Sequence, residues 1–365
     1  NASLSANYSK HANDLSSPGA SSNNDWGAAL SVTQVLYAGG GLDAALDAQR
    51  LVRDAALLDL RGAVNTALTD VRVRFYNVLL TRDRVAVQEQ NIALYEEQLQ
   101  TVRSRRKAGA VSDFEVLRAE VALANARPAL ITARNDARIA LDVLLQSLGC
   151  ENTGTPPQII GALGYHPVKI ALADALAAAR AKRPDLLRLE KIASARDIAI
   201  SAENAAARPQ VGLFGGYQYR KNLASDSFRP AYASNGWLAG IQASWAIFDG
   251  RRIAGRVAQA KSQLAQAQLS LREAALAVDV EVRTALSALQ EAAELADAAQ
   301  KVVAQAEEAL RLADARYAAG SATQLDVLQS RVELTRARDN AVQANYSHNA
   351  ALANLRRAMG EGETW

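Results

Sequence analysis

The chain contains the same unit twice, and an offset of 211 residues aligns the two copies without a gap. The first copy covers 1–149 and the second covers 212–360. Identical residues that recur at this offset include Trp26 and Trp237, Gly39 and Gly250, Arg72 and Arg283, Gly109 and Gly320, and Gly149 and Gly360. A chance alignment would not keep a tryptophan and three glycines in register over this length, so we expect two similar folding units.

Each copy begins with residues of alternating polarity. Leu4, Ala6 and Tyr8 of the first copy alternate with small polar side chains, and the alternation returns in the second copy, for example from Trp237 onward. A period of two is typical of strands with one apolar and one polar face. Segments 1–37 and 211–248 are therefore predicted to form four strands, arranged as two hairpins with loops rich in Ser, Asn, Asp and Gly.

The rest of each copy, 38–149 and 249–360, has the pattern of long helices. Apolar residues in the first copy are spaced by four and three positions, at Val64, Leu68, Val71, Phe75 and Val78. This spacing is typical of a coiled-coil seam. Because glycine ends helices, Gly109 and Gly320 should separate each long helix from a second one, over about 112–148 and 323–359. We expect a helical hairpin in each copy.

The segment between the copies, 150–210, has no counterpart before the first copy. It begins with a stretch rich in Gly and Pro, and Arg183-Pro184-Asp185-Leu186 then has the pattern of a helix start. We expect short linking helices that contact the long ones. A helix leading into the second copy, with none before the first, also predicts that a helix and a secretory signal lie upstream in the gene.

The strands have the properties of membrane strands. The sequence has no run of about 18 apolar residues, as a spanning helix would need. Strands with one apolar face must close into a barrel in lipid, and four strands are too few, so several chains would have to contribute. Seven aromatic residues lie on or near the ends of the strands, as an interfacial girdle requires: Tyr8, Trp26, Tyr37, Tyr217, Tyr219, Trp237 and Trp245. A soluble sheet that caps a helical bundle is the alternative.

The order of hairpin, helical hairpin and linking helices, repeated once, resembles the TolC family of outer-membrane efflux and secretion channels over nearly the whole chain. The most specific matches are Arg105-x-x-Ala-Gly-x5-Glu-Val-Leu and Arg316-Tyr-x-Ala-Gly-x5-Asp-Val-Leu, which resemble the two helical tips at the periplasmic mouth of such channels. Arg183-Pro184-Asp185-Leu186 and Arg208-Pro209 resemble signatures of the middle segment.

The resemblance implies a fold that is mainly α with a contribution to a membrane β-barrel. Four strands and about four long helices per chain would close as a homotrimer, with a twelve-stranded barrel in outer-membrane lipid and a helical tunnel in the periplasm. The function implied is that of exit duct for a tripartite efflux pump or a type I secretion system. The partners implied are a periplasmic adaptor (membrane fusion) protein and an inner-membrane pump.

The same resemblance assigns roles to the tip residues. Adaptor docking would use small side chains around two glycine turns, at Ala108, Gly109, Ala110, Ala319, Gly320 and Ser321. Tyr317 would donate to Glu115 in a periplasmic gate, with Asp326 from each chain forming a constricting acidic ring. Both acids follow their turn glycine by six residues, so we expect them at one level. Two positions depart from the family pattern, since Ala322 replaces an arginine and Gln329 replaces an acid found in some members.

Catalytic, metal-binding and cofactor-binding patterns are absent from the sequence. Its three histidines, His11, His166 and His348, belong to separate segments and are not expected to meet, and Cys150 is the only cysteine. The glycines before the first long helix lack the Lys-Ser/Thr of a phosphate-binding loop. A net charge of +3 without a block of like charges does not predict a nucleic-acid partner. We therefore expect no enzyme, cofactor or metal site.

Two further function classes stay open at this stage. A soluble coiled-coil scaffold would also be rich in long helices, and a periplasmic adaptor has a long helical hairpin. An adaptor has a single hairpin inside a β-domain, whereas this chain has two in tandem, so the channel is preferred. The cargo is not encoded in any motif, although one methionine, Met359, argues against a methionine-lined path for copper or silver ions.

Overall fold

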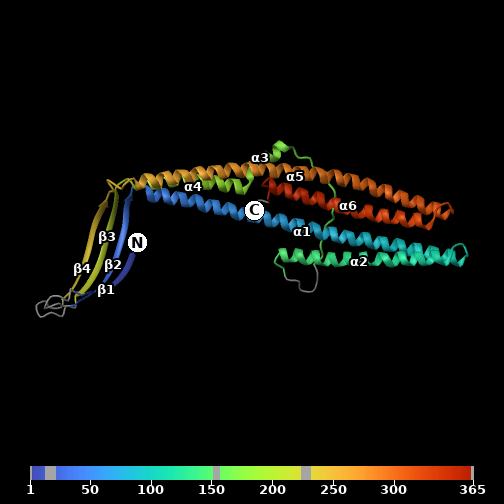
Figure 1. Cartoon of the computed structure of the whole chain (residues 1–365), viewed down its shortest axis with the longest axis horizontal. Coiled ribbons are helices and arrows are strands. Elements are labelled where there is room, and N and C mark those ends of the chain that lie inside the picture. Colours follow the sequence, from blue (N-terminus) through green and yellow to red (C-terminus); the bar gives the residue numbers. More distant parts are fainter. Residues whose placement is uncertain (1, 13–21, 151–156, 223–231, 363–365) are drawn as a thin grey trace. The chain divides into compact units, whose positions relative to one another are not determined.

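The computed structural model describes residues 2–12, 22–150, 157–222 and 232–362, which are mainly helical with one four-stranded sheet (Figure 1). The strands are β1 (Ala2–Ala12), β2 (Ser22–Ala38), β3 (Gln210–Asn222) and β4 (Tyr232–Ser244). The helices are α1 (Gly41–Lys107), α2 (Asp113–Ser147), α3 (Leu172–Lys182), α4 (Pro184–Ala205), α5 (Arg252–Ala318) and α6 (Gln324–Ala358). None of the described helices combines the length and the apolar character that crossing a membrane requires.

The sequence repeat is also a structural repeat. Helices α1 and α5 have 67 residues each and α2 and α6 have 35 each, and their first and last residues are related by the 211-residue offset. The left-handed backbone positions follow the same offset, in the pairs Gly39 and Gly250, Gly40 and Arg251, Gly109 and Gly320, and Gly149 and Gly360. Arg251 is the one described residue other than glycine with a positive φ, of 68°.

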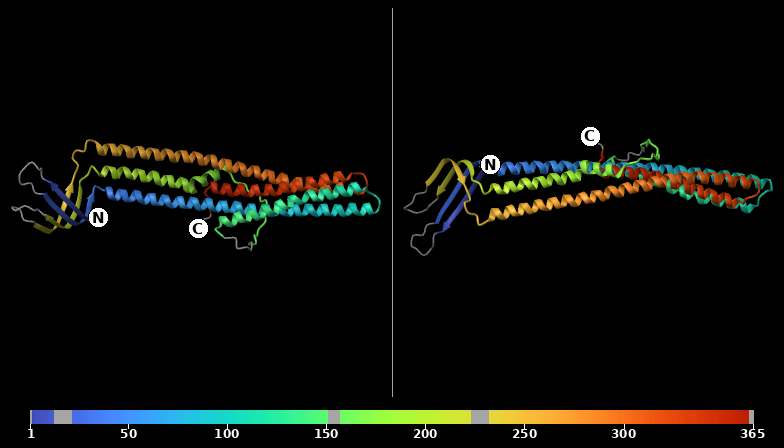
Figure 2. Two further views of the ribbon diagram at one scale, coloured as in Figure 1. Left: turned by 60° about the horizontal axis from the view of Figure 1, so that its bottom comes forward. Right: turned by 90° about the horizontal axis from the view of Figure 1, so that it is seen from above.

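The described chain forms two compact units, Asn1–Ala56 with Arg188–Leu271 and Leu57–Leu187 with Arg272–Trp365. The first contains the sheet with the adjoining ends of α1, α4 and α5. The second contains the two helical hairpins, α1 with α2 and α5 with α6, together with α3 (Figure 2).

The four strands form a single antiparallel sheet in the order β1-β2-β3-β4. The two predicted hairpins are thus joined edge to edge by β2 and β3. Leu4 lies opposite Leu30, Leu30 opposite Tyr217, and Tyr217 opposite Trp237. An apolar row therefore crosses the whole sheet, while β1 and β4 remain at its edges. Most of the predicted loop between the first two strands lies outside the described residues.

The end of α4 is joined to both places where a strand gives way to a long helix. The Arg208 guanidinium donates to the Gly39 carbonyl at 2.9 Å, and the Trp245 indole donates to the Ala207 carbonyl at 3.0 Å. A side chain at Gly39 would put its Cβ 2.5 Å from the Ala205 carbonyl oxygen, so this close approach requires glycine.

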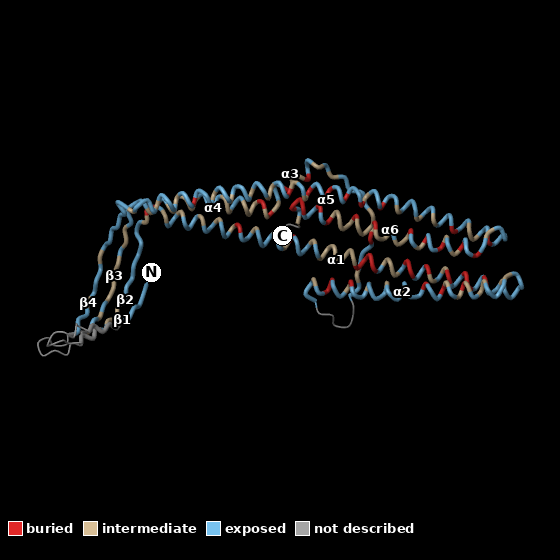
Figure 3. Tube along the Cα trace, viewed as in Figure 1, coloured by how far each residue is buried: buried red, intermediate tan, exposed pale blue. Residues whose placement is uncertain are grey.

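Each helical hairpin of the second unit has its own apolar core, and buried residues concentrate there (Figure 3). Tyr95, Leu99, Ala119, Leu123 and Ala126 form the core between α1 and α2. Leu310, Tyr317, Val327 and Leu334 form the one between α5 and α6. The heptad spacing of these residues explains both hairpins, because it places them on one face of each helix.

Arg183, between α3 and α4, is a hub of the second unit. Its guanidinium donates to both carboxylate oxygens of Asp185 at 3.0 and 2.7 Å, to Glu281 of α5 at 2.5 Å, and to the Ala358 carbonyl of α6 at 3.3 Å. The side chain is nearly buried. The predicted helix start at Arg183-Pro184-Asp185 therefore also fixes the junction between α3 and α4 to the second hairpin.

Candidate functional site

The two hairpin tips are closed by glycines in the left-handed conformation. Gly109 has a φ of 73° and Gly320 of 75°. The following residues bond back into the helix, with Ala110 N donating to Arg105 O and Ser321 N to Arg316 O, both at 2.9 Å. All six predicted tip residues are exposed, and a Cβ added at either glycine would meet no atom within 4 Å. The tips therefore present small, open surfaces.

Behind these tips, Tyr317 joins the two hairpins. Its hydroxyl donates to Glu115 of α2 at 3.2 Å, and Gln324 of α6 donates to the Glu115 carbonyl at 3.2 Å. The Arg105 guanidinium lies 4.6 Å from the centre of the Tyr317 ring. The tyrosine is 9% exposed, and this burial, followed by the nearby Glu115 charge, raises its pKa. The phenol thus stays protonated and able to donate.

The same positions in the first copy have a different role. Arg106 and Asp113 occupy the positions that correspond to Tyr317 and Gln324, and they form an ion pair within their own hairpin, at 2.5 and 2.9 Å. In the second copy both positions contact Glu115 of the other hairpin instead. The two repeat-related positions thus make a bond within the hairpin in the first copy and bonds between the two hairpins in the second.

Asp326 and Glu115 occupy corresponding positions but have different partners. Asp326 forms a capping box with Thr323: its carboxylate accepts from the Thr323 backbone N–H at 2.8 Å, and its own N–H donates to the Thr323 hydroxyl at 3.3 Å. These hydrogen bonds hold the pKa of Asp326 below its usual value. The carboxylate therefore stays ionised, at the start of α6.

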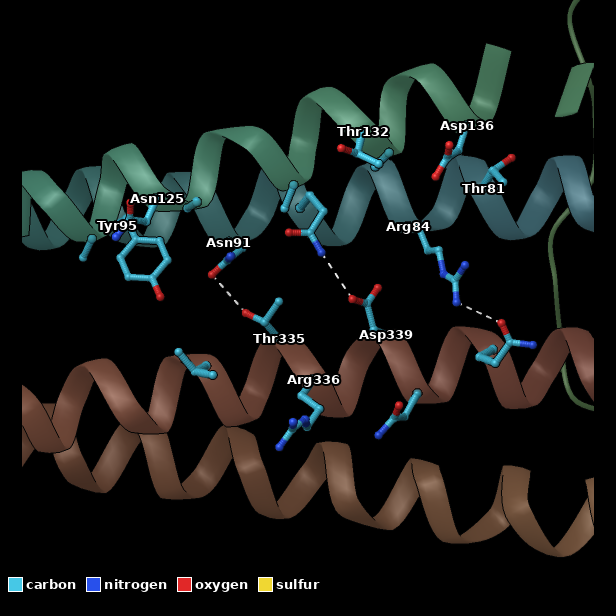
Figure 4. A pocket seen from close by; sticks show the side chains of 18 of the residues that line it. Thr81, Arg84, Asn91, Tyr95, Asn125, Thr132, Asp136, Thr335, Arg336 and Asp339 are labelled. Carbon is cyan, nitrogen blue, oxygen red and sulfur yellow. Dashed lines mark hydrogen bonds between the residues drawn. The ribbon is translucent and has the colours of Figure 1, made fainter. Parts of the chain in front are cut away.

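A row of polar contacts between α1 and α6, here called the polar ladder, lies further from the tips. Its rungs are Arg84 to Gln343 at 2.9 Å, Gln88 to Asp339 at 3.2 Å, Thr335 to Asn91 at 2.9 Å, and Arg331 to Gln98 at 3.2 Å. Three rungs are visible in Figure 4, where Asn125, Thr132 and Asp136 of α2 complete the wall of a groove of about 1010 Å³. The two hairpins thus meet through these polar groups as well as through apolar contacts, such as those of Leu94 and Leu328 with the core of the opposite hairpin.

Arg331 is the most buried charge of this ladder and was missed by the sequence analysis. Its guanidinium also donates to the Leu94 carbonyl of α1 and lies 3.6 Å from Asp314 of α5. It therefore links α6 to two neighbouring helices. The polar residues of α1 recur at 84, 88, 91 and 98, with steps of four, three and seven, and that heptad spacing is the signal that could have identified a buried polar seam.

The extended segment 157–171, here called the strap, crosses the two hairpins on its way from α2 to α3 (Figure 2). Arg82 of α1 donates to the Gly161 carbonyl at 2.8 Å, and Asn345 and Asn349 of α6 donate to the Leu163 and Gly164 carbonyls at 3.3 and 2.9 Å. Donors from both hairpins thus hold the strap.

His348 of α6 is buried beside the strap. It is 1% exposed, neither ring nitrogen has a hydrogen-bond partner among the described residues, and the Tyr165 ring packs edge-on at 4.8 Å. Burial, followed by the proximity of His166, lowers the pKa of His348. These two histidines therefore lie near each other, contrary to the sequence expectation, because the strap brings 166 back to α6.

We expect stability to fall below about pH 6.5, the usual pKa of an unfolded histidine. The folded chain binds a proton on His348 less readily than the unfolded chain does. The contribution of neutral His348 to stability is therefore complete above that pH and decreases as the pH falls. Urea unfolding between pH 8 and 5, followed by circular dichroism, would measure the slope. His348→Phe should flatten it, while His166→Gln should largely keep it. An unchanged slope in His348→Phe would assign the effect to other groups.

Comparison with known proteins shows which family this chain resembles. The family described as outer membrane efflux protein matches residues 1–150 and 175–361. The pyoverdine export outer membrane protein OpmQ of Pseudomonas aeruginosa is 27% identical, over 99% of this chain and 77% of its own. The outer membrane efflux protein BepC of Brucella suis is 25% identical over 83% of this chain, which spans only 65% of BepC.

The fold is similar to that of a solved protein. The crystal structure of CusC, described in connection with transmembrane channel formation, superposes with a TM-score of 0.78 over 99% of this chain and 84% of CusC, at 20% identity. These relatives have names of efflux or export proteins and not of enzymes. The chain belongs to the outer membrane efflux protein family, and its location is the outer membrane.

Proposed function

We propose that this chain is one subunit of a trimeric outer-membrane channel that serves as the exit duct of an export machine. The observation that carries the proposal is the sheet, which has an apolar row across all four strands and two edge strands, β1 and β4. Leu4, Leu30, Trp237 and Ile241 on this face are exposed to the surroundings. Such a face suits lipid, and it is unfavourable in water.

The open edges favour assembly of several copies. Within a bilayer each unpaired backbone N–H or C=O costs several kcal/mol, so β4 of one chain must pair with β1 of another until the sheet closes. Three chains with four strands each would give twelve, within the range of known membrane barrels. Segments 1–37 and 211–248 would be the membrane part, 38–149 and 249–360 the periplasmic tunnel, and 150–210 the linking helices.

Exposed apolar residues on the helices support contacts between copies. They follow one face of α2 and one of α5 at helical spacing: Phe114, Leu117, Val121, Ile131 and Ile139, and Leu276, Val280, Leu295, Val302 and Leu312. The two sets lie on different hairpins, as a ring with head-to-tail contacts requires. The exposed tips would dock a periplasmic adaptor and, through it, an inner-membrane pump, in efflux or in type I secretion.

Reconstitution tests the proposal directly. The chain purified in detergent should have the mass of three copies, and it should produce discrete conductance steps in planar bilayers. A monomer that stays dispersed without detergent, and that gives no conductance, would contradict the channel and favour the soluble scaffold.

We propose that Tyr317 and Glu115 hold the periplasmic mouth closed, with Asp326 from each chain forming a constricting acidic ring there. The hydrogen bond from Tyr317 is charge-assisted and partly shielded from water, so three symmetry copies would favour closure. We expect Tyr317→Phe combined with Glu115→Gln to raise single-channel conductance severalfold. Arg106→Gln, which breaks the corresponding bond within the first hairpin, is the matched control and should leave conductance near the unmodified value. Unchanged conductance in an intact trimer of the double variant would make these residues packing positions only.

A further inference from the structure

The two strand-to-helix junctions of the first unit carry unusually exposed apolar residues. Ile247 is 86% exposed and Phe248 is 90% exposed, and Trp245 precedes them. The corresponding segment of the first copy, 35–37, is also apolar and exposed. Both copies thus leave the sheet through residues that are unfavourable in water and suit the boundary between a bilayer and water.

Basic residues follow directly. Arg251, Arg252 and Arg256 have no basic counterpart in the first copy, whereas Lys261 corresponds to Arg50, which pairs with Asp47. Arg251, Arg252, Arg256 and Lys261 are all exposed, and none has an acidic partner among the described residues. The nearby Asp249 carboxylate instead accepts from the backbone N–H groups of residues 251 and 253, at 2.9 and 2.7 Å. Four cations are therefore free to contact an external anion.

Arg251 occupies a backbone position that favours glycine. Its φ of 68° lies in the left-handed region, and the corresponding residue of the first copy is Gly40, with a φ of 83°. A residue with a Cβ is unfavourable there, so a contact of its side chain would have to offset that cost. The first copy therefore shows the same turn with glycine in place of the arginine.

A groove beside this junction contains Trp245 and Ile247 but not Phe248, Arg251 or Arg252, and Asp249 is one of its lining residues. It has a volume of about 650 Å³ and is lined by Trp245, Ile247, Ile253, Val257 and Lys261, among others. The indole of Trp245 is fixed by its hydrogen bond to the Ala207 carbonyl. Apolar side chains thus lie near the end of the strand, and a cation lies further along α5.

We propose that this junction surface, made by Trp245, Ile247, Phe248, Arg251 and Arg252, binds anionic phospholipid of the membrane leaflet from which the chain emerges after β4. Ile247 and Phe248 contact the acyl chains, and the two arginines contact lipid phosphates. The inference rests on the proposed insertion of the sheet into the membrane. It assigns lipid recognition to the second copy alone, because the first copy has Gly40 and Gly41 where the second has the arginines.

The test uses the full chain in nanodiscs of phosphatidylcholine with and without phosphatidylglycerol. Native mass spectrometry then counts the lipid molecules that stay bound to the protein after it is released from the nanodisc. The unmodified chain should retain phosphatidylglycerol preferentially. Arg251→Gly combined with Arg252→Gly reproduces the first copy and should weaken this retention about thirtyfold, as expected for two interfacial charges. Lys191→Ser, which removes an exposed cation of α4, is the control and should have no effect.

Backbone strain is separated from lipid binding by two single variants. Arg251→Lys should keep the lipid preference, and Arg251→Gly should weaken it although it relieves the strained φ. Equal retention by the double variant and the unmodified chain, or no preference for the anionic lipid, would overturn the inference while leaving the channel intact. Failure of the chain to enter nanodiscs of either composition would instead overturn the channel proposal together with this one.

Discussion

Replacing Gly360 with alanine is expected to lower the free energy of unfolding by about 3 kcal/mol, through strain and overlap together. The added Cβ would lie 2.8 Å from both the Arg183 nitrogen and the Lys182 carbonyl carbon, and these backbone atoms cannot move aside cheaply. The residue also has a φ of 72°, which alanine disfavours. The change should therefore disturb the junction of α3 and α4.

Gly149, at the corresponding position of the first copy, provides a control for that variant. It has nearly the same φ, of 68°, but no atom lies within 4 Å of an added Cβ. Gly149→Ala should therefore cost only the conformational strain, about 1 kcal/mol. Urea unfolding followed by circular dichroism would compare the two variants. Equal losses of the free energy of unfolding in the two variants would mean that the backbone between α3 and α4 does not limit the space at residue 360.

Arg183→Met is expected to destabilise the second unit by about 2 kcal/mol, since it removes the hydrogen bonds of a nearly buried guanidinium to two partly exposed carboxylates and a backbone carbonyl. Asp185 loses a bidentate ion pair, and the Ala358 carbonyl loses a donor. Glu281 keeps one contact, to Arg357 at 3.2 Å, which limits the loss.

The adjacent lysine separates this effect from a general loss of charge. Lys182 forms an exposed ion pair with Glu361 at 2.8 Å, and Lys182→Met should change the free energy of unfolding by less than about 1 kcal/mol. Thermal unfolding in detergent would compare both variants with the unmodified chain. Similar small shifts for the two would contradict the role of Arg183 as a hub.

Much of the fold could be predicted because local signals determine it. The glycines at 109 and 320 and the period change after residue 37 predicted helices close to the observed ones, with 112–148 and 323–359 against Asp113–Ser147 and Gln324–Ala358. Because the repeat has no gap, each helix boundary could be predicted from both copies. The joining of the two strand hairpins into one sheet has no local signal, since it depends on β2 meeting β3 across a separation of almost 200 residues.

The site was predicted only in part. The Tyr317 to Glu115 contact followed from the family resemblance, because no spacing rule connects residues 202 positions apart. Arg331 and the polar ladder were missed because polar side chains on a long helix usually face solvent. These side chains become buried only because the two hairpins lie against each other. The contact of His166 with the surroundings of His348 depends on the path of the strap, which a sequence rich in Gly and Pro does not specify.

The polar ladder also affects the order in which the chain can fold. Each hairpin core unites neighbouring helices joined by a short turn, whereas the rungs join residues 233 to 259 positions apart. Contacts between nearby residues form fast and distant ones form slowly, so both hairpins should be complete before the ladder closes. Before the ladder closes, water can hydrogen-bond to its polar side chains. The polar side chains themselves therefore expose little apolar surface at this stage. Polar rungs are thus expected to make this late stage of folding less prone to aggregation than a wholly apolar seam would.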